Sequence, residues 1–89
     1  MVGPEYEWDE AKRELNLAKH DVDFSVVETF DWLTAKSKQS DRRGESRMAA
    51  TGFIGSRLYR VIFTERGDLI RIISLRKANP REVREYEQT

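Results

Sequence analysis

The C-terminal third of the sequence carries cationic side chains that could bind a phosphate. Arg76 and Lys77 directly follow an apolar segment, and the short segment after them contains Arg81, Arg84 and Tyr86. An Arg guanidinium suits phosphate because its planar fork donates two parallel hydrogen bonds and stays charged at any working pH. The sequence therefore indicates an anion-binding surface that could hold an RNA or DNA backbone.

The same residue types could also cleave RNA. Attack by the RNA's own 2′-hydroxyl needs a base, an acid, and cations that stabilise the charge developing on the phosphate. His20, the single histidine, has an ordinary pKa near 6.5 and needs the least adjustment to move protons. Structural interpretations compete: Tyr86 could dock a helix, and Arg76-Lys77 could be a solvated strand end. Composition alone favours these structural interpretations.

Other chemistries find little support. The chain has no cysteine, and His20 with nearby Asp21 and Asp23 makes a weak ligand set, so we expect neither a metal nor another cofactor. Gly52, Gly55 and Gly67 are typical of turns rather than of a phosphate-binding loop. The sequence shows neither a signal peptide nor a membrane span, which predicts a cytoplasmic protein.

The formal charge is zero, but it is unevenly distributed. Residues 1–41 contain 5 Lys/Arg against 10 Asp/Glu, and residues 42–89 contain 11 against 6. Because binding responds to local potential, the basic half remains able to meet nucleic acid. The acidic half could face a different partner.

The elements that must position these residues make a single domain over residues 1–89. Apolar spacing predicts a helix over Trp8–Lys19, with Lys12, Asn16 and Lys19 forming a polar stripe beside its apolar one. A second helix is expected from near Ser25, with Glu28 completing a capping box.

Four strands are expected to follow, then a helix opened by Asn79-Pro80 with Glu82 completing a capping box. The predicted strands are Leu33–Lys38, Ser46–Phe53, Arg57–Thr64 and Asp68–Leu75, with a loop over Gln39–Gly44. The predicted fold class is α+β, with two N-terminal helices, a four-stranded antiparallel sheet and a C-terminal helix.

Motifs spread along nearly the whole chain resemble one family. Tyr6 to Lys12, then Asn16, Lys19-His20, Val22 and Phe24, resemble the opening of the BrnT family of toxins from type II toxin–antitoxin pairs. Gly44-Glu45, Arg47, Gly52, Gly55 and Arg57 continue the resemblance. The run VIFTERGDLIRIISLRKA, Val61 to Ala78, is its most specific part, and Glu82 and Tyr86 follow at the family's spacing.

The resemblance implies a RelE-like fold and a metal-independent ribonuclease that arrests translation. It marks as candidate catalytic residues Lys19, His20, Glu45, Arg47, Arg76, Lys77 and Tyr86. The candidate RNA-binding residues are Lys12, Asn16, Arg57, Arg71, Arg81 and Arg84. Individual acid and base roles stay open. Asp21 stands where the family commonly has Gly, and an acid beside His20 is expected to raise its pKa.

The resemblance also implies partners. The expected partner is a BrnA-like ribbon-helix-helix antitoxin, which neutralises the toxin and forms a heterotetramer with it. The toxin is expected to contact operator DNA only through this antitoxin. RNA is the expected substrate, and no membrane is involved. An alternative hypothesis is a catalytically degenerate module that still binds the antitoxin or nucleic acid.

Overall fold

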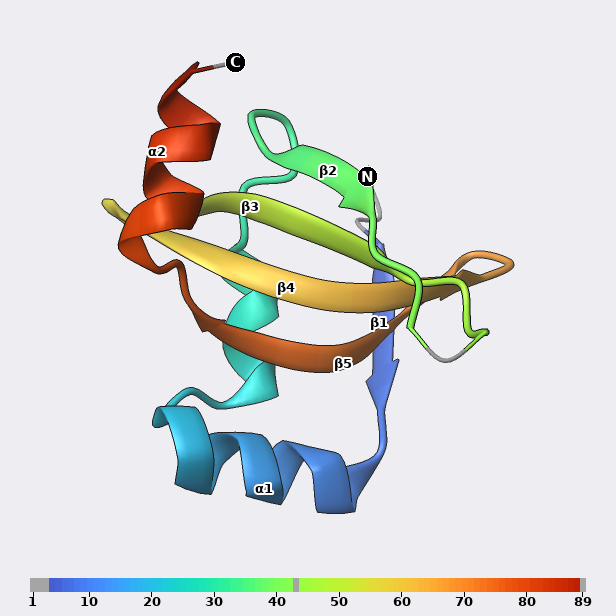
Figure 1. Cartoon of the computed structure of the whole chain (residues 1–89). Coiled ribbons are helices and arrows are strands. Elements are labelled where there is room, and N and C mark those ends of the chain that lie inside the picture. The colour runs from blue at the N-terminus through green and yellow to red at the C-terminus, as the bar shows by residue number, and fades with distance from the viewer. Residues whose placement is uncertain (1–3, 43, 89) are drawn as a thin grey trace.

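Five strands form one sheet in the computed structural model, which describes residues 4–42 and 44–88. The strands lie in the order β1-β5-β4-β3-β2 (Figure 1). Their bounds are Glu5–Trp8 for β1, Lys36–Gln39 for β2, Met48–Ile54 for β3, Arg57–Arg66 for β4 and Leu69–Lys77 for β5. All neighbouring strands are antiparallel except β1, which runs parallel to β5. The sheet is therefore mixed.

The prediction of four antiparallel strands needs a correction, because β1 had not been expected. This strand is only four residues long and pairs with β5 across more than 60 residues of sequence. A parallel pair of this kind has no hairpin turn to mark it in the sequence. The three strands β3, β4 and β5 lie within two residues of their predicted bounds. The fourth predicted strand, Leu33–Lys38, is β2 shifted toward the C-terminus.

The helices are α1, Glu10–His20, and α2, Pro80–Gln88, with a 3₁₀ segment η1 over Phe24–Thr29. The second predicted helix is this six-residue 3₁₀ segment, and its N-cap is Asp23 instead of Ser25. The predicted capping box of α2 is confirmed: Glu82 N donates to Asn79 Oδ1, and Asn79 N donates to Glu82 Oε1. In the described residues, no helix has the length and apolarity to cross a membrane.

One face of the sheet forms the core. Strand alternation places Ala50, Val61 and Leu75 in one cross-strand row, and all three are fully buried. Phe24 and Val27 of η1 pack on this face, and η1 lies behind the sheet in Figure 1. The opposite face, which we call the open face, carries the cross-strand row Thr51, Arg60 and Arg76.

Asn16 fixes α1 against the β5 side of the open face. Its amide nitrogen donates to the carbonyl oxygens of Val22 and Leu75, and its amide oxygen accepts the backbone N–H of Leu75. Asp21 ends α1 in the left-handed conformation, with φ of 58°, and its N–H donates to Leu17 O. Glycine adopts this left-handed conformation most easily, which explains why the family resemblance predicts Gly at this position. In this chain Asp21 adopts the same conformation.

Candidate functional site

The polar stripe of α1 lies over the β5 edge of the open face. There it lines a hollow of about 200 Å³, which we call the α1 hollow. The lining residues are Lys12, Leu15, Asn16, Lys19, His20, Ile73 and Ser74. The sequence predicted this stripe, and the packing of α1 on β5 turns it toward the sheet.

The charge of Arg76 acts on His20, which lines this hollow, although 56 positions separate the two residues in the sequence. Burial lowers the pKa of His20 from its ordinary value, and the positive charges of Lys19 and Arg76 lower it further. The expectation that Asp21 raises this pKa is therefore wrong. A lowered pKa keeps the imidazole neutral near pH 7, which is the form that accepts a proton.

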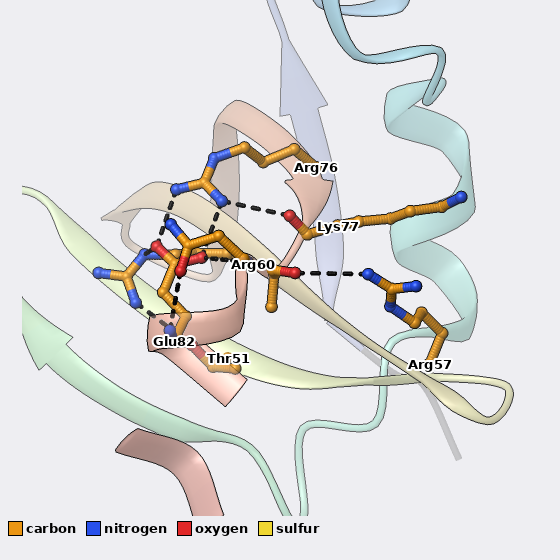
Figure 2. A network of polar contacts seen from close by, with 8 residues as sticks. Thr51, Arg57, Arg60, Arg76, Lys77 and Glu82 are labelled. Carbon is orange, nitrogen blue, oxygen red and sulfur yellow. Dashed lines mark hydrogen bonds and ion pairs between the residues drawn. The ribbon is translucent and has the colours of Figure 1, made fainter. Parts of the chain in front are cut away.

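Arg76 belongs to a second cluster, centred on the buried carboxylate of Glu82 (Figure 2). Both terminal nitrogens of Arg76 donate to the two Glu82 oxygens at 2.8 Å, and Arg60 Nε lies 3.2 Å from Glu82 Oε2. Burial raises the pKa of Glu82, but the hydrogen bonds from Arg76 and from Asn79 N and the charges of both arginines outweigh it. The resulting pKa is about 2. Glu82 thus holds two guanidinium groups on the open face.

Lys77 does not join Arg76 in this cluster. Consecutive strand residues point to opposite faces, and Lys77 pairs with Tyr59 in the row of the core face. Figure 2 shows its side chain extending away from Arg76 and Glu82. The structure therefore separates two neighbouring residues that the sequence placed in one group.

Glu45 and Arg47 belong to the connection between β2 and β3, which lies at the end of the sheet away from α2 (Figure 1). Arg47 donates to Glu45 Oε2 at 2.7 Å. This hydrogen bond, the Arg47 charge, and the charges of Lys12 and Arg66 lower the pKa of Glu45. Buried Arg47 Nε and Thr64 Oγ1 have no hydrogen-bond partner in the described structure. Lys12, in the N-terminal half of α1, is thus the residue of the α1 stripe whose charge acts on Glu45.

Tyr86 lines a different hollow, of about 320 Å³, which we call the α2 hollow. Its hydroxyl donates to Thr34 O, its ring contacts Phe53 edge-on, and the Lys36 ammonium lies 4.5 Å from the ring centre. The residues around this hollow are Lys36, Ser37, Lys38, Ala49, Thr51, Arg60, Glu82, Glu85, Tyr86 and Gln88. The phenol hydrogen is used structurally here, and Tyr86 is not among the residues that line the α1 hollow.

The predicted RNA-binding residues are distributed over several surfaces. Lys12 lines the α1 hollow, and Arg71 forms an ion pair with Glu7. Arg57 donates weakly to Ala78 O and, with Arg84, lines a third hollow that shares no residue with the other two.

Two further predicted residues differ in exposure. Arg81 is exposed on α2. Asn16 is buried, and its amide is occupied by the backbone of Val22 and Leu75. The structure therefore gives Asn16 a positioning role.

Arg60 and Glu82 are central to the arrangement, yet the sequence did not single them out as site residues. The only structural role expected for Glu82 was the capping box, which uses one of its two oxygens. Its second oxygen meets Arg60 because the β4–β5 register places Arg60 opposite Arg76. The available signal in the sequence was a charged residue, Arg60, among the apolar residues in the middle of a central strand. Within the described ranges, no group of three or more His, Asp or Glu could hold a metal ion.

Comparisons with known proteins agree with this architecture. The crystal structure of the ribonuclease toxin BrnT from Brucella abortus is 34% identical, with a TM-score of 0.70, and the match covers 86% of this chain and 99% of that one. Among curated proteins, none matches significantly. The sequence model of the family described as "Ribonuclease toxin, BrnT, of type II toxin-antitoxin system" matches residues 8–82. The chain therefore belongs to the BrnT family of ribonuclease toxins of type II toxin–antitoxin systems.

Proposed function

We propose that this chain is an endoribonuclease toxin that cleaves RNA without a metal ion and so arrests translation in the cytoplasm. The observation that carries the proposal is that Lys12, Lys19 and His20 line one hollow beside β5, where the charges of Lys19 and Arg76 act on His20. A neutral imidazole within electrostatic range of a fixed guanidinium suits attack of a 2′-hydroxyl on the neighbouring phosphate.

In the proposed reaction, His20 takes the proton of the 2′-hydroxyl, and the 2′-oxygen forms a bond to phosphorus. The bond from phosphorus to the 5′-oxygen breaks, leaving a 2′,3′-cyclic phosphate and a 5′-hydroxyl. Arg76 stabilises the negative charge on the phosphoryl oxygens. Lys19, next to His20, is the candidate that protonates the leaving 5′-oxygen.

The other candidate residues receive supporting roles in this proposal. Arg47, paired with Glu45, would bind a flanking phosphate, and Lys12 would bind a phosphate at the α1 hollow. Arg71, Arg57, Arg81 and Arg84 would contribute only long-range attraction. Lys77 points to the other face and Tyr86 lies in the α2 hollow, so we leave both out of the reacting group.

The decisive experiment measures cleavage of RNA by the purified chain in excess chelator, with product ends identified by mass spectrometry. We expect cyclic phosphate ends, and a loss of about 10²–10⁴-fold in rate for His20→Ala. Arg76→Lys keeps the charge but loses the paired hydrogen bonds, and we expect a loss of about 10²-fold. Normal cleavage by both variants would overturn the site, and a strict metal requirement would overturn the mechanism.

We further propose that the partner is a ribbon-helix-helix antitoxin, which forms a heterotetramer with the toxin and alone contacts operator DNA. Membership of a toxin–antitoxin family supports an antitoxin partner in general. Co-expression of the neighbouring reading frame, followed by light scattering of the purified complex, tests the stoichiometry. A complex of another composition would contradict it.

A second candidate function is a catalytically silent module that binds the antitoxin. The observation in its favour is that Glu82 already occupies both terminal nitrogens of Arg76 and compensates its charge. If so, expression without the partner would leave growth unchanged, while the chain would still capture its antitoxin. Growth arrest that disappears in His20→Ala would favour the ribonuclease.

A further inference from the structure

The α2 hollow adjoins the proposed cleavage site and is not needed by its chemistry. It shares Arg60 and Glu82 with the cluster that holds Arg76 (Figure 2). The cross-strand row Thr51, Arg60 and Arg76 runs from its floor to the cleavage site. A chain that bound Arg76 could therefore continue into the hollow along the same face of the sheet.

Cations surround this hollow from two directions. The β2–β3 register places Lys36 opposite Thr51 and Lys38 opposite Ala49, so both lysines are on the open-face side of β2. Arg60 reaches the hollow from β4, where NH1 donates to Thr51 Oγ1 at 3.3 Å and Nε pairs with Glu82. Arg60 is therefore fixed before any ligand arrives, which reduces the entropy lost on binding.

The two acids at the hollow differ in their effect. Glu82 is 4% exposed and is compensated by both Arg60 and Arg76, so little of its charge acts on the hollow. Glu85 is exposed to solvent, where its charge is screened. The small side chains of Ala49 and Thr51 leave space above β3, and the Tyr86 ring forms part of the wall.

We propose that the α2 hollow is a second RNA subsite, which binds the phosphate and sugar of a nucleotide next to the cleaved bond. Lys38 and Arg60 bind the phosphate, and Glu82 positions Arg60 by holding Nε. The volume, about 320 Å³, lies in the range of small-ligand sites and suits one nucleotide. The proposal rests on the proposed function for its choice of ligand, because RNA is the polyanion that would reach Arg76.

The test measures binding of a 12-nucleotide RNA in which every 2′-hydroxyl is replaced by fluorine, so that cleavage cannot occur. Fluorescence anisotropy gives Kd over a series of salt concentrations for the full chain and for Lys38→Gln. Lys38 is exposed, so this change leaves the fold intact. We expect Kd to rise about 3- to 10-fold, and the slope of log Kd against log salt to fall by about 0.7, the value for one lost phosphate contact on a single strand.

A matched control removes the same charge elsewhere. Arg42→Gln alters an exposed cation in the connection between β2 and β3, which does not line the hollow. We expect its Kd to change less than 2-fold. Arg60→Gln should weaken binding at least as much as Lys38→Gln, and circular dichroism establishes whether it folds.

Cleavage assays separate this proposal from the proposed function. If the chain cleaves RNA, Lys38→Gln should raise KM with kcat unchanged, because the subsite binds ground state and transition state alike. Cleavage with equal Kd for Lys38→Gln and Arg42→Gln would overturn the subsite and leave the ribonuclease intact. Absence of cleavage with the expected loss of binding would overturn the ribonuclease and leave the subsite intact.

Discussion

The two faces of the sheet use the same strands for different purposes. Leu75 is fully buried against η1, whereas its neighbour Arg76 points to the open face and pairs with Glu82. The core face is stabilised by non-directional apolar contacts, which remove apolar surface from water. The open face is held by a few directional hydrogen bonds around Glu82 and Asn16. Stability is therefore expected mainly from the core face, whereas the proposed chemistry uses residues of the open face.

The largest expected effect is on the core face. Leu75→Ala removes a fully buried side chain and should lower the free energy of unfolding by about 2–5 kcal/mol, because it leaves a cavity in the core cluster. Urea denaturation measures the change. Ser74→Ala, at the neighbouring position, loses one weak hydrogen bond and should change it by less than about 1 kcal/mol. Equal effects at both positions would contradict the division between faces.

Glu82→Gln tests whether the open face also contributes stability. The pKa of Glu82 falls from 4.5 to about 2 on folding, which corresponds to up to about 3 kcal/mol at neutral pH. Because the folded pKa is the lower one, this stability is present above pH 4.5 and is lost as pH falls toward 2. The difference between the two proteins should narrow over that window in urea titrations. Glu85→Gln is the exposed control, and a pH-independent difference would refute the assignment.

Asn16→Ala should have a smaller effect, about 1–3 kcal/mol, because it leaves backbone groups of Leu75 and Val22 without partners. It should also loosen α1 on β5 and reduce any RNA cleavage. Leu15→Ala, on the same helix but 70% exposed, should stay within about 0.5 kcal/mol of the unaltered chain. Thermal denaturation with parallel cleavage assays distinguishes them.

The smallest expected effect is electrostatic. NMR titration of the single histidine should give a pKa below 6.5, and Lys19→Gln should move it upward, because one of the charges that lower it is gone. Lys38→Gln, at the far side of the open face, should leave it unchanged. Any cleavage that uses His20 as base should decline as pH falls through the same value. A pKa above 6.5 would contradict the described surroundings of His20.

Local patterns predicted most of the fold. The strands β3 to β5 are separated by short glycine-containing turns, and Asn79 with Glu82 forms the expected capping box at α2. Parallel β1 and the 3₁₀ form of η1 were not predicted, because both depend on packing against residues distant in sequence. The predicted polar stripe of Lys12, Asn16 and Lys19 lines one hollow in the structure, together with the neighbouring His20. The separation of Lys77 from Arg76 became clear only from the register of β5, which pairs Arg76 with Arg60 and Lys77 with Tyr59.

The sequence by itself determined which groups are available: a single imidazole, many guanidinium groups, and the motif run shared with the BrnT family. Helical and strand periodicity are properties of short segments, so the sequence also predicted most of the helices and strands. The tertiary structure alone decided that Glu82 joins Arg60 to Arg76 and that the charge of Arg76 acts on His20. Those contacts depend on cross-strand register and on the docking of α1, which long-range packing fixes and no local pattern records.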